Sequence, residues 1–350
     1  MELSTLKSAI GKIASRVGAM ENQRRRTSNA LRSVGKLKFK VGNLTDDSII
    51  NKVKKARPTC SVAGVDGGLL TRSFHGIDVV VTRAVGVVFD YKEGKVVGSK
   101  VFPQKVPFIS ELSSSSDGEL ITVASLYRMR EEVSRAVEVV EKASPDFIMM
   151  DGPLYPHPST RVAKGSGLKK LYMEVVGLYN LLASSCAERG TGLVGIVEDS
   201  RSGYFASVLF NKIVPNLPNS KEFSGVVFRD TALLFDALNP GERTFTFKIP
   251  NIQDLNYKDR VFAFYIKTAK YDRPLRVEFL SGNPGEDAKT VASLTYGIAA
   301  FPRYGLPSVL VEADARAKLK QHYMHYIQRM LFSHSRSPLV MSLRRENRQI

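Results

Sequence analysis

The stretch VAGVDGG, residues 62–68, decides the fold of this chain, because it sets an acidic residue at the end of an apolar run. Its first four residues are predicted to form a short buried strand that ends in a turn at the glycines. A carboxylate at Asp66 is costly to bury unless something compensates it, and the two glycines keep side-chain bulk away from it. The alternative is an ordinary Asp-Gly turn, in which the aspartate closes its own backbone turn.

A second stretch, FIMMDGPL at 147–154, repeats this arrangement of apolar residues, an aspartate and a glycine. It predicts a strand over 147–151 that ends at Asp151. In an open α/β sheet the carboxyl ends of the strands face the ligand crevice. Asp66 and Asp151 are therefore predicted to share one crevice.

The elements around these two motifs define the fold class. The order of three strands in a meander, a helix, a strand, a helix and a strand predicts an α/β, ribonuclease-H-like mixed sheet with flanking helices. The expected strands are 62–65, 77–90, 95–102, 147–151 and 193–197, with helices at 119–143 and 168–189. Later strands are expected at 244–249, 260–269 and 275–280, before one C-terminal helix at 307–332.

Three regions follow from these assignments. Residues 1–57 are predicted to be a basic helical region, 58–335 the ribonuclease-H-like domain with inserted strands at about 200–300, and 336–350 a basic tail. The N-terminal helix carries an apolar stripe at spacings of three and four, formed by Leu6, Ile10, Ile13 and Val17. Such a stripe must pack on something, and we expect dimerisation or docking on another protein.

Composition narrows the function classes. No run of about 18 apolar residues occurs, so no membrane span is expected. Two cysteines are too few for a disulfide framework or a four-ligand zinc site, which favours a cytoplasmic protein. The formal charge of +17 favours a polyanionic partner such as nucleic acid, although a solvated basic surface has the same composition.

The helix at 119–143 offers a third carboxylate. Because successive helical residues advance by about 100°, Glu132 falls on the apolar face and Glu131 on the wetter one. Glu132 is therefore expected to point toward the sheet. Two alternatives stay open, namely an ion pair of Glu132 with Arg128 or Arg135, and Glu119 as a substitute ligand.

Three carboxylates in one cleft repel each other unless divalent cations lie among them. Oxygen ligands suit Mg²⁺ or Mn²⁺, and two such ions can activate a water and stabilise the leaving oxygen of a phosphodiester. No convincing His or Cys nucleophile and no phosphate-binding GxxxxGK[ST] motif is present. A fourth acid could come from the last helix, where helical spacing does not decide between Glu312 and Asp314.

Five motifs in the same order resemble the NurA nucleases of archaea over roughly residues 60–320. They are VAGVDGG, PDFIMMDGPL at 145–154, GIVEDSRS at 195–202, AFYIKTAKYDRPLRVEF at 263–279 and YGLPSVLVEADARAKL at 304–319. The resemblance implies a Mn²⁺-dependent (or Mg²⁺-dependent) DNA nuclease with two ions, single-strand endonuclease activity and 5′-to-3′ exonuclease activity. It also implies a homodimer that works with the hexameric translocase HerA in DNA end resection.

The resemblance also implies roles for single residues. Asp66, Glu132 and Asp151 correspond to the metal ligands, and Tyr304 to a tyrosine near the C terminus. Asp314 stands where the family usually has His, which is why it is preferred to Glu312 as the fourth catalytic residue. An aspartate can ligate a metal but cannot act as an imidazole acid.

Basic residues near the predicted crevice are expected to hold the DNA backbone without reading bases. The DNA-binding residues are predicted to be Arg161, Lys164, Lys169, Lys267 and Arg276, with Tyr304 stacking on an unpaired base. Two other functions fit the same sequence: a basic DNA-binding adaptor whose acids are structural, and a nuclease of the same fold that cleaves RNA. Loss of Mn²⁺-dependent activity in an Asp66→Ala variant separates an enzyme from the adaptor.

Overall fold

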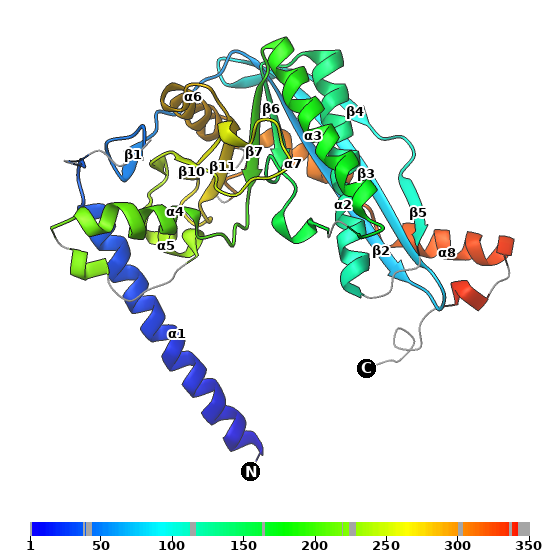
Figure 1. Ribbon diagram of the computed structural model, residues 1–350, viewed down its shortest axis with the longest axis horizontal. Helices are drawn as coiled ribbons and strands as arrows, with labels where there is room; N and C mark the ends of the chain where they lie inside the picture. Colours follow the sequence, from blue (N-terminus) through cyan, green and yellow to red (C-terminus); the bar gives the residue numbers. More distant parts are fainter. Residues whose placement is uncertain are drawn as a thin grey trace. The chain divides into compact units, whose positions relative to one another are not determined.

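The chain divides into two compact units in a computed structural model (Figure 1). Unit 1 comprises residues 1–56, 196–251 and 260–306, and unit 2 comprises 57–195, 252–259 and 307–350. The structure describes every residue except 1, 38, 40–43, 113–116, 163–164, 219, 224–228, 300–303, 336–337 and 342–350. Most of the predicted basic tail lies outside the described residues.

Unit 2 is built on a mixed sheet with the strand order β7-β6-β2-β3-β4, and β5 also pairs with β3. β2 and β6 run parallel, whereas β2, β3 and β4 form the predicted antiparallel meander. The bounds are β2 Ser61–Ser73, β3 Asp78–Lys92, β4 Lys95–Pro103, β5 Phe108–Leu112, β6 Phe147–Asp151 and β7 Gly192–Val197. The predicted mixed sheet is thus confirmed.

β2 does not end before Asp66, as the sequence suggested, but continues for seven more residues to Ser73. The two glycines stay in the strand and pair with β3, where Asp66 lies opposite Val85. β6 is much shorter and pairs only with residues 62–65 of β2. Asp66 is therefore the first residue of β2 beyond the stretch that pairs with β6.

Helices cover both faces of the unit 2 sheet. α2 (Asp117–Ala143) packs on β2 and β3, and α3 (Lys169–Arg189) packs on α2 (Figure 1). α7 (Ser308–Ala317) lies against the opposite face, where a Cβ added to Gly64 would come within 2.7 Å of the Val309 carbonyl carbon. The helix predicted over 307–332 is two helices, because the chain leaves α7 in an extended conformation at Lys318 before α8 (His322–Ser335). A short 3₁₀ helix spans Pro158–Thr160 and another Pro338–Val340.

Unit 1 holds the remaining strands in the order β1-β8-β10-β11, with β9 paired to β10. The strands are β1 Ile50–Lys52, β8 Glu242–Thr244, β9 Phe247–Lys248, β10 Val261–Lys267 and β11 Leu275–Leu280. The helices are α1 Glu2–Ser33, α4 Tyr204–Val208, α5 Asp230–Ala237 and α6 Pro284–Gly297. Shorter helical turns occupy Leu209–Ile213, Val214–Asn216, Ser220–Phe223 and Lys258–Arg260, the last spanning the boundary between the units in sequence.

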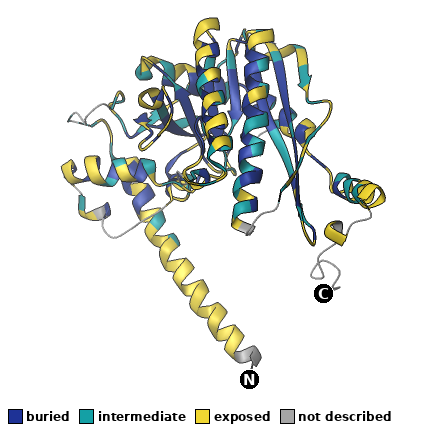
Figure 2. Cartoon of the chain, turned by 45° about the vertical axis from the view of Figure 1, so that its right-hand side comes forward, coloured by how far each residue is buried: buried dark blue, intermediate teal, exposed yellow. Residues whose placement is uncertain are grey.

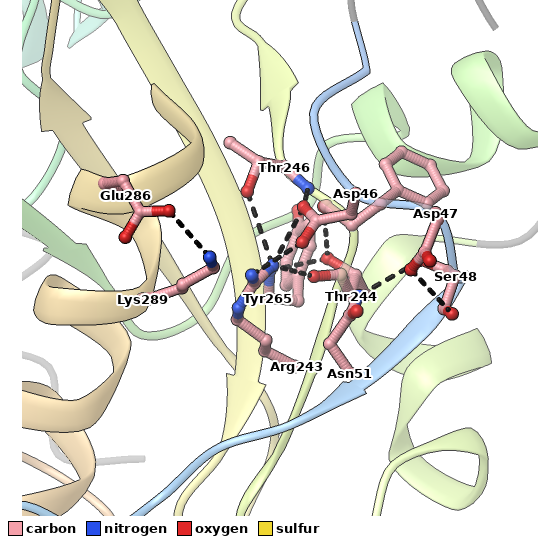
Figure 3. A network of polar contacts seen from close by, with 11 residues as sticks. Asp46, Asp47, Ser48, Asn51, Arg243, Thr244, Thr246, Tyr265, Glu286 and Lys289 are labelled. Atoms are coloured by element: carbon pink, nitrogen blue, oxygen red, sulfur yellow. Dashed lines mark hydrogen bonds and ion pairs between the residues drawn. The ribbon is translucent and has the colours of Figure 1, made fainter. Parts of the chain in front are cut away.

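The N-terminal region is not helical throughout, as had been predicted for 1–57. α1 ends at Ser33, and residues 44–52 run along the strands of unit 1 instead. Asp46 holds this segment against residues 243–246. Its carboxylate accepts hydrogen bonds from the Arg243 guanidinium at 2.7 and 3.0 Å and from the Thr246 amide at 2.7 Å (Figure 3). Arg243 is buried, so this ion pair replaces the hydration that its charge loses. No described helix is long and apolar enough to cross a membrane.

Candidate active site

Asp66 and Asp151 lie side by side where β6 ends. The parallel register places Val65 beside Met150, so the next residue of each strand is an aspartate on the same face of the sheet. A side-chain hydrogen bond joins the two carboxyl groups. Two carboxyl groups form such a bond only when one of them carries a proton, and a cation bound between them would take the place of that proton.

Asp66 is buried, with only 5% of its surface exposed, and burial is the largest influence on the pKa of its carboxyl group. Burial raises the pKa of this carboxyl, and the charge of Asp314 raises it further. The Gly67 amide, which donates to Asp66 Oδ1 at 2.6 Å, the bond to Asp151 and the charge of Arg128 oppose this rise. A positive charge close to Asp66 would therefore stabilise the charged form of this carboxyl group.

Glu132 reaches the same point of β2 from α2, on the other face of the sheet. It is buried, as the helical spacing predicted, and Gly67 makes room for it: a Cβ on Gly67 would lie 2.5 Å from Glu132 Oε1. That oxygen is buried and has no hydrogen-bond partner. Burial raises the pKa of Glu132 to about 8, the charge of Arg128 lowers it, and that of Asp66 raises it. Glu131 instead accepts bonds from Gln104 and Arg130.

Arg128 is the counter-charge of this acidic group. Its Nη1 lies 3.3 Å from Glu132 Oε1, one helical turn away. The charges of Glu132, Asp151 and Asp66 raise the pKa of the guanidinium, so it lies within electrostatic reach of all three acids. From the sequence, Arg128 is expected only as a possible ion-pair partner of Glu132. Its spacing of four from Glu132 was the signal that could have assigned it to the site.

Helix α7 adds Asp314 to the face on which Asp66 lies. Asp314 is exposed, and its charge acts on Asp66. Glu312, the other acid considered, forms an ion pair with Arg316 at 2.6 Å. The structure therefore brings Asp314 rather than Glu312 to the acidic group.

Among the described residues, no three His, Cys, Asp or Glu side chains lie close enough together to grip one ion. Two observations nevertheless fit a divalent cation: the hydrogen bond between the Asp66 and Asp151 side chains, and the buried Glu132 Oε1, which has no hydrogen-bond partner and lies 3.3 Å from the Arg128 guanidinium. Both supply only oxygen ligands, which suit Mg²⁺ or Mn²⁺. Glu119, the substitute ligand, lines a separate cavity of about 360 Å³ between α2 and α3.

The predicted DNA-binding residues are distributed over both units. Arg161 and Lys169 follow β6 in the chain, and both lie at Tyr172: Arg161 hydrogen-bonds it and Lys169 Nζ lies 5.0 Å from its ring centre. Tyr304, in unit 1, is 56% exposed. Lys164 lies outside the described residues.

Lys267 and Arg276 lie in the interior of unit 1, so the prediction that they bind DNA is wrong. Each is 5% exposed. Lys267 donates to the Phe235 carbonyl, and Arg276 donates to Ser200 and Ser202 and pairs with Glu278 at 2.9 Å. Their positive charges stabilise buried polar groups of their own unit, so they are not available to track a DNA backbone.

A mixed sheet covered by helices on both faces, with Asp66 and Asp151 where a short parallel strand ends, is an arrangement in which acidic side chains can serve phosphodiester hydrolysis. The particular family follows from the sequence: the chain belongs to the NurA family, whose NurA domain model matches residues 60–319. No curated protein sequence matches the chain.

Solved NurA structures share the fold. The NurA nuclease from Sulfolobus solfataricus is 17% identical, and the match covers 92% of this chain and 96% of that one with a TM-score of 0.59. A NurA bound to dAMP and manganese is 12% identical, with 95% and 98% coverage and a TM-score of 0.54. At these identities the likeness establishes the fold of the chain.

Proposed function

We propose that this chain is a divalent-metal-dependent deoxyribonuclease whose metal ligands are Asp66, Glu132 and Asp151, with Asp314 as a fourth catalytic acid. The observation that carries the proposal is the bond between the side chains of Asp66 and Asp151, with Glu132 buried at the same position of β2 and its Oε1 lacking a hydrogen-bond partner. Structural acids normally bind backbone amides or basic side chains, whereas Asp66, besides accepting from the Gly67 amide, bonds to a second carboxyl group. A NurA of the same fold has been crystallised with dAMP and manganese, which makes Mn²⁺ the first ion to test.

Two Mn²⁺ or Mg²⁺ ions bound here would supply activation of a water and stabilisation of the leaving oxygen. Residues of the chain bind the ions, make room for the ligands and balance their charge. Asp66 and Asp151 would bind the ions in their charged form, and Gly67 keeps the space that Glu132 needs. The positive charge of Arg128 partly neutralises the three acids.

Arg161 and Lys169 are proposed to hold the phosphates of the DNA strand, because both follow Asp151 in the chain. Lys169 is the first residue of α3, where the helix dipole also favours negative charge. Replacing Lys169 by Gln should weaken binding equally for all sequences and flatten the dependence of binding on salt concentration. Lys142→Gln, at an exposed position on α2, is the matched control.

Single-strand endonuclease and 5′-to-3′ exonuclease activities, a homodimer and a HerA-type ATPase partner in end resection complete the proposal, on the resemblance of the sequence motifs. The assay is Mn²⁺-dependent cleavage of end-labelled single-stranded DNA by the wild type and by the Asp66→Asn and Asp151→Asn variants. Both variants should lose at least a hundredfold in rate while retaining their circular dichroism spectra. Glu131→Gln, beside the site on α2, is the control and should stay active.

Each other outcome of that assay has a definite meaning. Undiminished cleavage by the folded variants would refute the assignment of the site. Cleavage of RNA in preference to DNA would leave the site intact but change the substrate. No cleavage by the wild type, even with the ATPase added, would favour the DNA-binding adaptor.

A further inference from the structure

Arg128 brings a guanidinium to the acidic group without hydrogen-bonding to it. Its Nη1 lies 3.3 Å from Glu132 Oε1, yet that oxygen has no hydrogen-bond partner, so the contact is an ion pair only. A guanidinium carries five N–H donors in a planar fork. Among the described residues, none accepts a hydrogen bond from the fork of Arg128. The side chain is 37% exposed, so these donors are open to a ligand.

The neighbouring arginines of α2 are bound differently. Arg130 donates to Glu131 from Nε at 3.1 Å and from Nη2 at 2.9 Å. Arg135 donates to Glu138, one turn further along the helix. A carboxylate that accepts from the fork is the usual partner of an arginine that stabilises a fold. Arg128 has acids close by, but its fork is not satisfied in this way.

Arg128 lies at the border between the buried acids and solvent. Strands β3, β6 and β7 are mostly buried, whereas the helices expose their outer sides (Figure 2). The charges of Glu132, Asp151 and Asp66 all act on the guanidinium, and so does that of Tyr179 on α3. The guanidinium is therefore close to α2, to α3 and to the end of β6. A phosphodiester bound through ions at the two aspartates would lie within the same electrostatic reach.

We infer that Arg128 is a further catalytic residue, whose guanidinium fork binds the non-bridging oxygens of the scissile phosphate. The inference rests on the proposed nuclease function. A planar fork matches two oxygens of one phosphate group, which the ammonium of a lysine does not. In the free protein the charge of Glu132 keeps the fork near the site. The bound phosphate then supplies the acceptors that the protein does not.

The contact between the fork and the phosphate should strengthen during the reaction. Water adds its oxygen to phosphorus, the bond to the leaving oxygen breaks, and a proton passes from the water to the leaving oxygen through solvent. Arg128 keeps its proton throughout, because the acids around it raise the pKa of the guanidinium. As the water attacks, negative charge grows on the oxygens that the fork binds. Loss of the fork should therefore lower kcat more than it raises KM.

Cleavage kinetics at saturating Mn²⁺ separate a phosphate-binding fork from a simple counter-charge. Arg128→Lys keeps the charge and loses the fork, so kcat should fall at least tenfold. Arg128→Ala should lose about a hundredfold in kcat and regain part of it when guanidinium is added, but not with an equal concentration of NaCl. Arg135→Ala, whose fork is bound by Glu138, should lose little and gain nothing from guanidinium. A fully active Arg128→Lys, or an Arg128→Ala that guanidinium does not rescue, overturns the inference.

DNA binding tests the contact without metal or cleavage. The affinity for a fluorescent single-stranded oligonucleotide is measured by anisotropy, with chelator present, over a range of salt concentrations. Each lost phosphate contact lowers the slope of log K against log salt by about 0.7 for a single strand. Arg128→Gln should lose one such contact and Arg135→Gln none, although both substitutions change the net charge equally. A slope in Arg128→Gln equal to that of the wild type overturns the inference.

These readouts also keep the inference apart from the nuclease proposal. If Asp66→Asn cleaves normally, the nuclease proposal fails, and a lower slope in Arg128→Gln still supports the phosphate contact. If Asp66→Asn is inactive and Arg128→Lys is fully active, the nuclease proposal stands and this inference fails. Calorimetry should show Mn²⁺ binding no weaker in Arg128→Gln, and weaker binding by the folded variant would mean that Arg128 only positions the ligands. Circular dichroism identifies folded variants, and Arg128→Lys serves in both tests if Arg128→Gln does not fold.

Discussion

The buried Glu132 permits a prediction that separates a metal ligand from a structural ion pair. Glu132→Gln keeps the size of the side chain and removes its charge. If the carboxylate is held for a cation, its burial destabilises the metal-free protein, and the substitution should stabilise it at alkaline pH. If the pair with Arg128 holds the fold together, the same substitution should destabilise it.

The sign and size follow from the pKa. Glu132 is raised from 4.5 to about 8, so the folded protein binds its proton more tightly than the unfolded chain does. The contribution of Glu132 to the free energy of unfolding is therefore fully present below pH 4.5 and is lost as the pH rises through 8. At about 1.4 kcal/mol per pKa unit, the penalty above pH 8 is at most about 5 kcal/mol, and relaxation of the site should reduce it to about 2.

Urea unfolding at pH 5, 6, 7 and 8 with chelator present measures this difference. We expect a smaller loss of stability with pH in Glu132→Gln, although the raised pKa of Asp66 leaves part of the slope. Glu131→Gln should keep the full slope, because that carboxylate is already paired. Saturating Mn²⁺ should stabilise the wild type by about 3 kcal/mol at a hundred times its Kd, and the variant less. A Glu132→Gln protein that is less stable than the wild type at pH 8 would refute the reasoning.

Two further predictions concern the surroundings of the carboxylates. Gly67→Ala places a Cβ 2.5 Å from Glu132 Oε1, so we expect at least a tenfold loss of cleavage rate and about 1–3 kcal/mol of stability in urea unfolding. Gly177→Ala, which has open space, should lose neither. Asp314→Asn should reduce cleavage and lower the pKa of Asp66, shifting the acid limb of the pH–rate profile downward, because it removes a nearby negative charge. Glu312→Gln on the same helix should leave that profile unchanged, and equal effects of the two would contradict the choice of Asp314.

Local sequence patterns predicted much of the sheet. Short apolar runs between breakers marked β6 and β7 closely, and the position of Glu132 on the apolar face of its helix predicted its burial. These patterns work because periodicity reports directly which side of an element is covered.

The path of β2 could not be predicted in the same way. Asp-Gly-Gly is typical of a turn, yet the strand continues through Gly67 and Gly68, because Glu132 and the end of α7 occupy the space that side chains would need. That reason is tertiary, and it involves residues far away in the sequence. Local preference is overridden wherever packing is this close.

The burial of two basic residues could not be predicted from the sequence either. Lys267 and Arg276 lie in a motif rich in basic residues, which suggested a surface that binds DNA. Lys267 binds a carbonyl of α5 and Arg276 binds the hydroxyls of Ser200 and Ser202, which lie in other segments of unit 1, whereas Glu278 is a neighbour of Arg276 on β11. Composition counts such charges as free because it carries no information on their pairing.

The interleaving of the two units has a consequence for synthesis of the protein. Residues 57–195 contribute β2, α2 and β6, but the helices that pack on the face of the sheet where Asp66 lies, α7 at 308–317 and α8 after it, come much later in the chain. A chain still on the ribosome thus carries both strand aspartates for more than a hundred residues before their cover is made. A nuclease arranged in this way should stay inert as a nascent chain, and prematurely terminated products should not damage DNA.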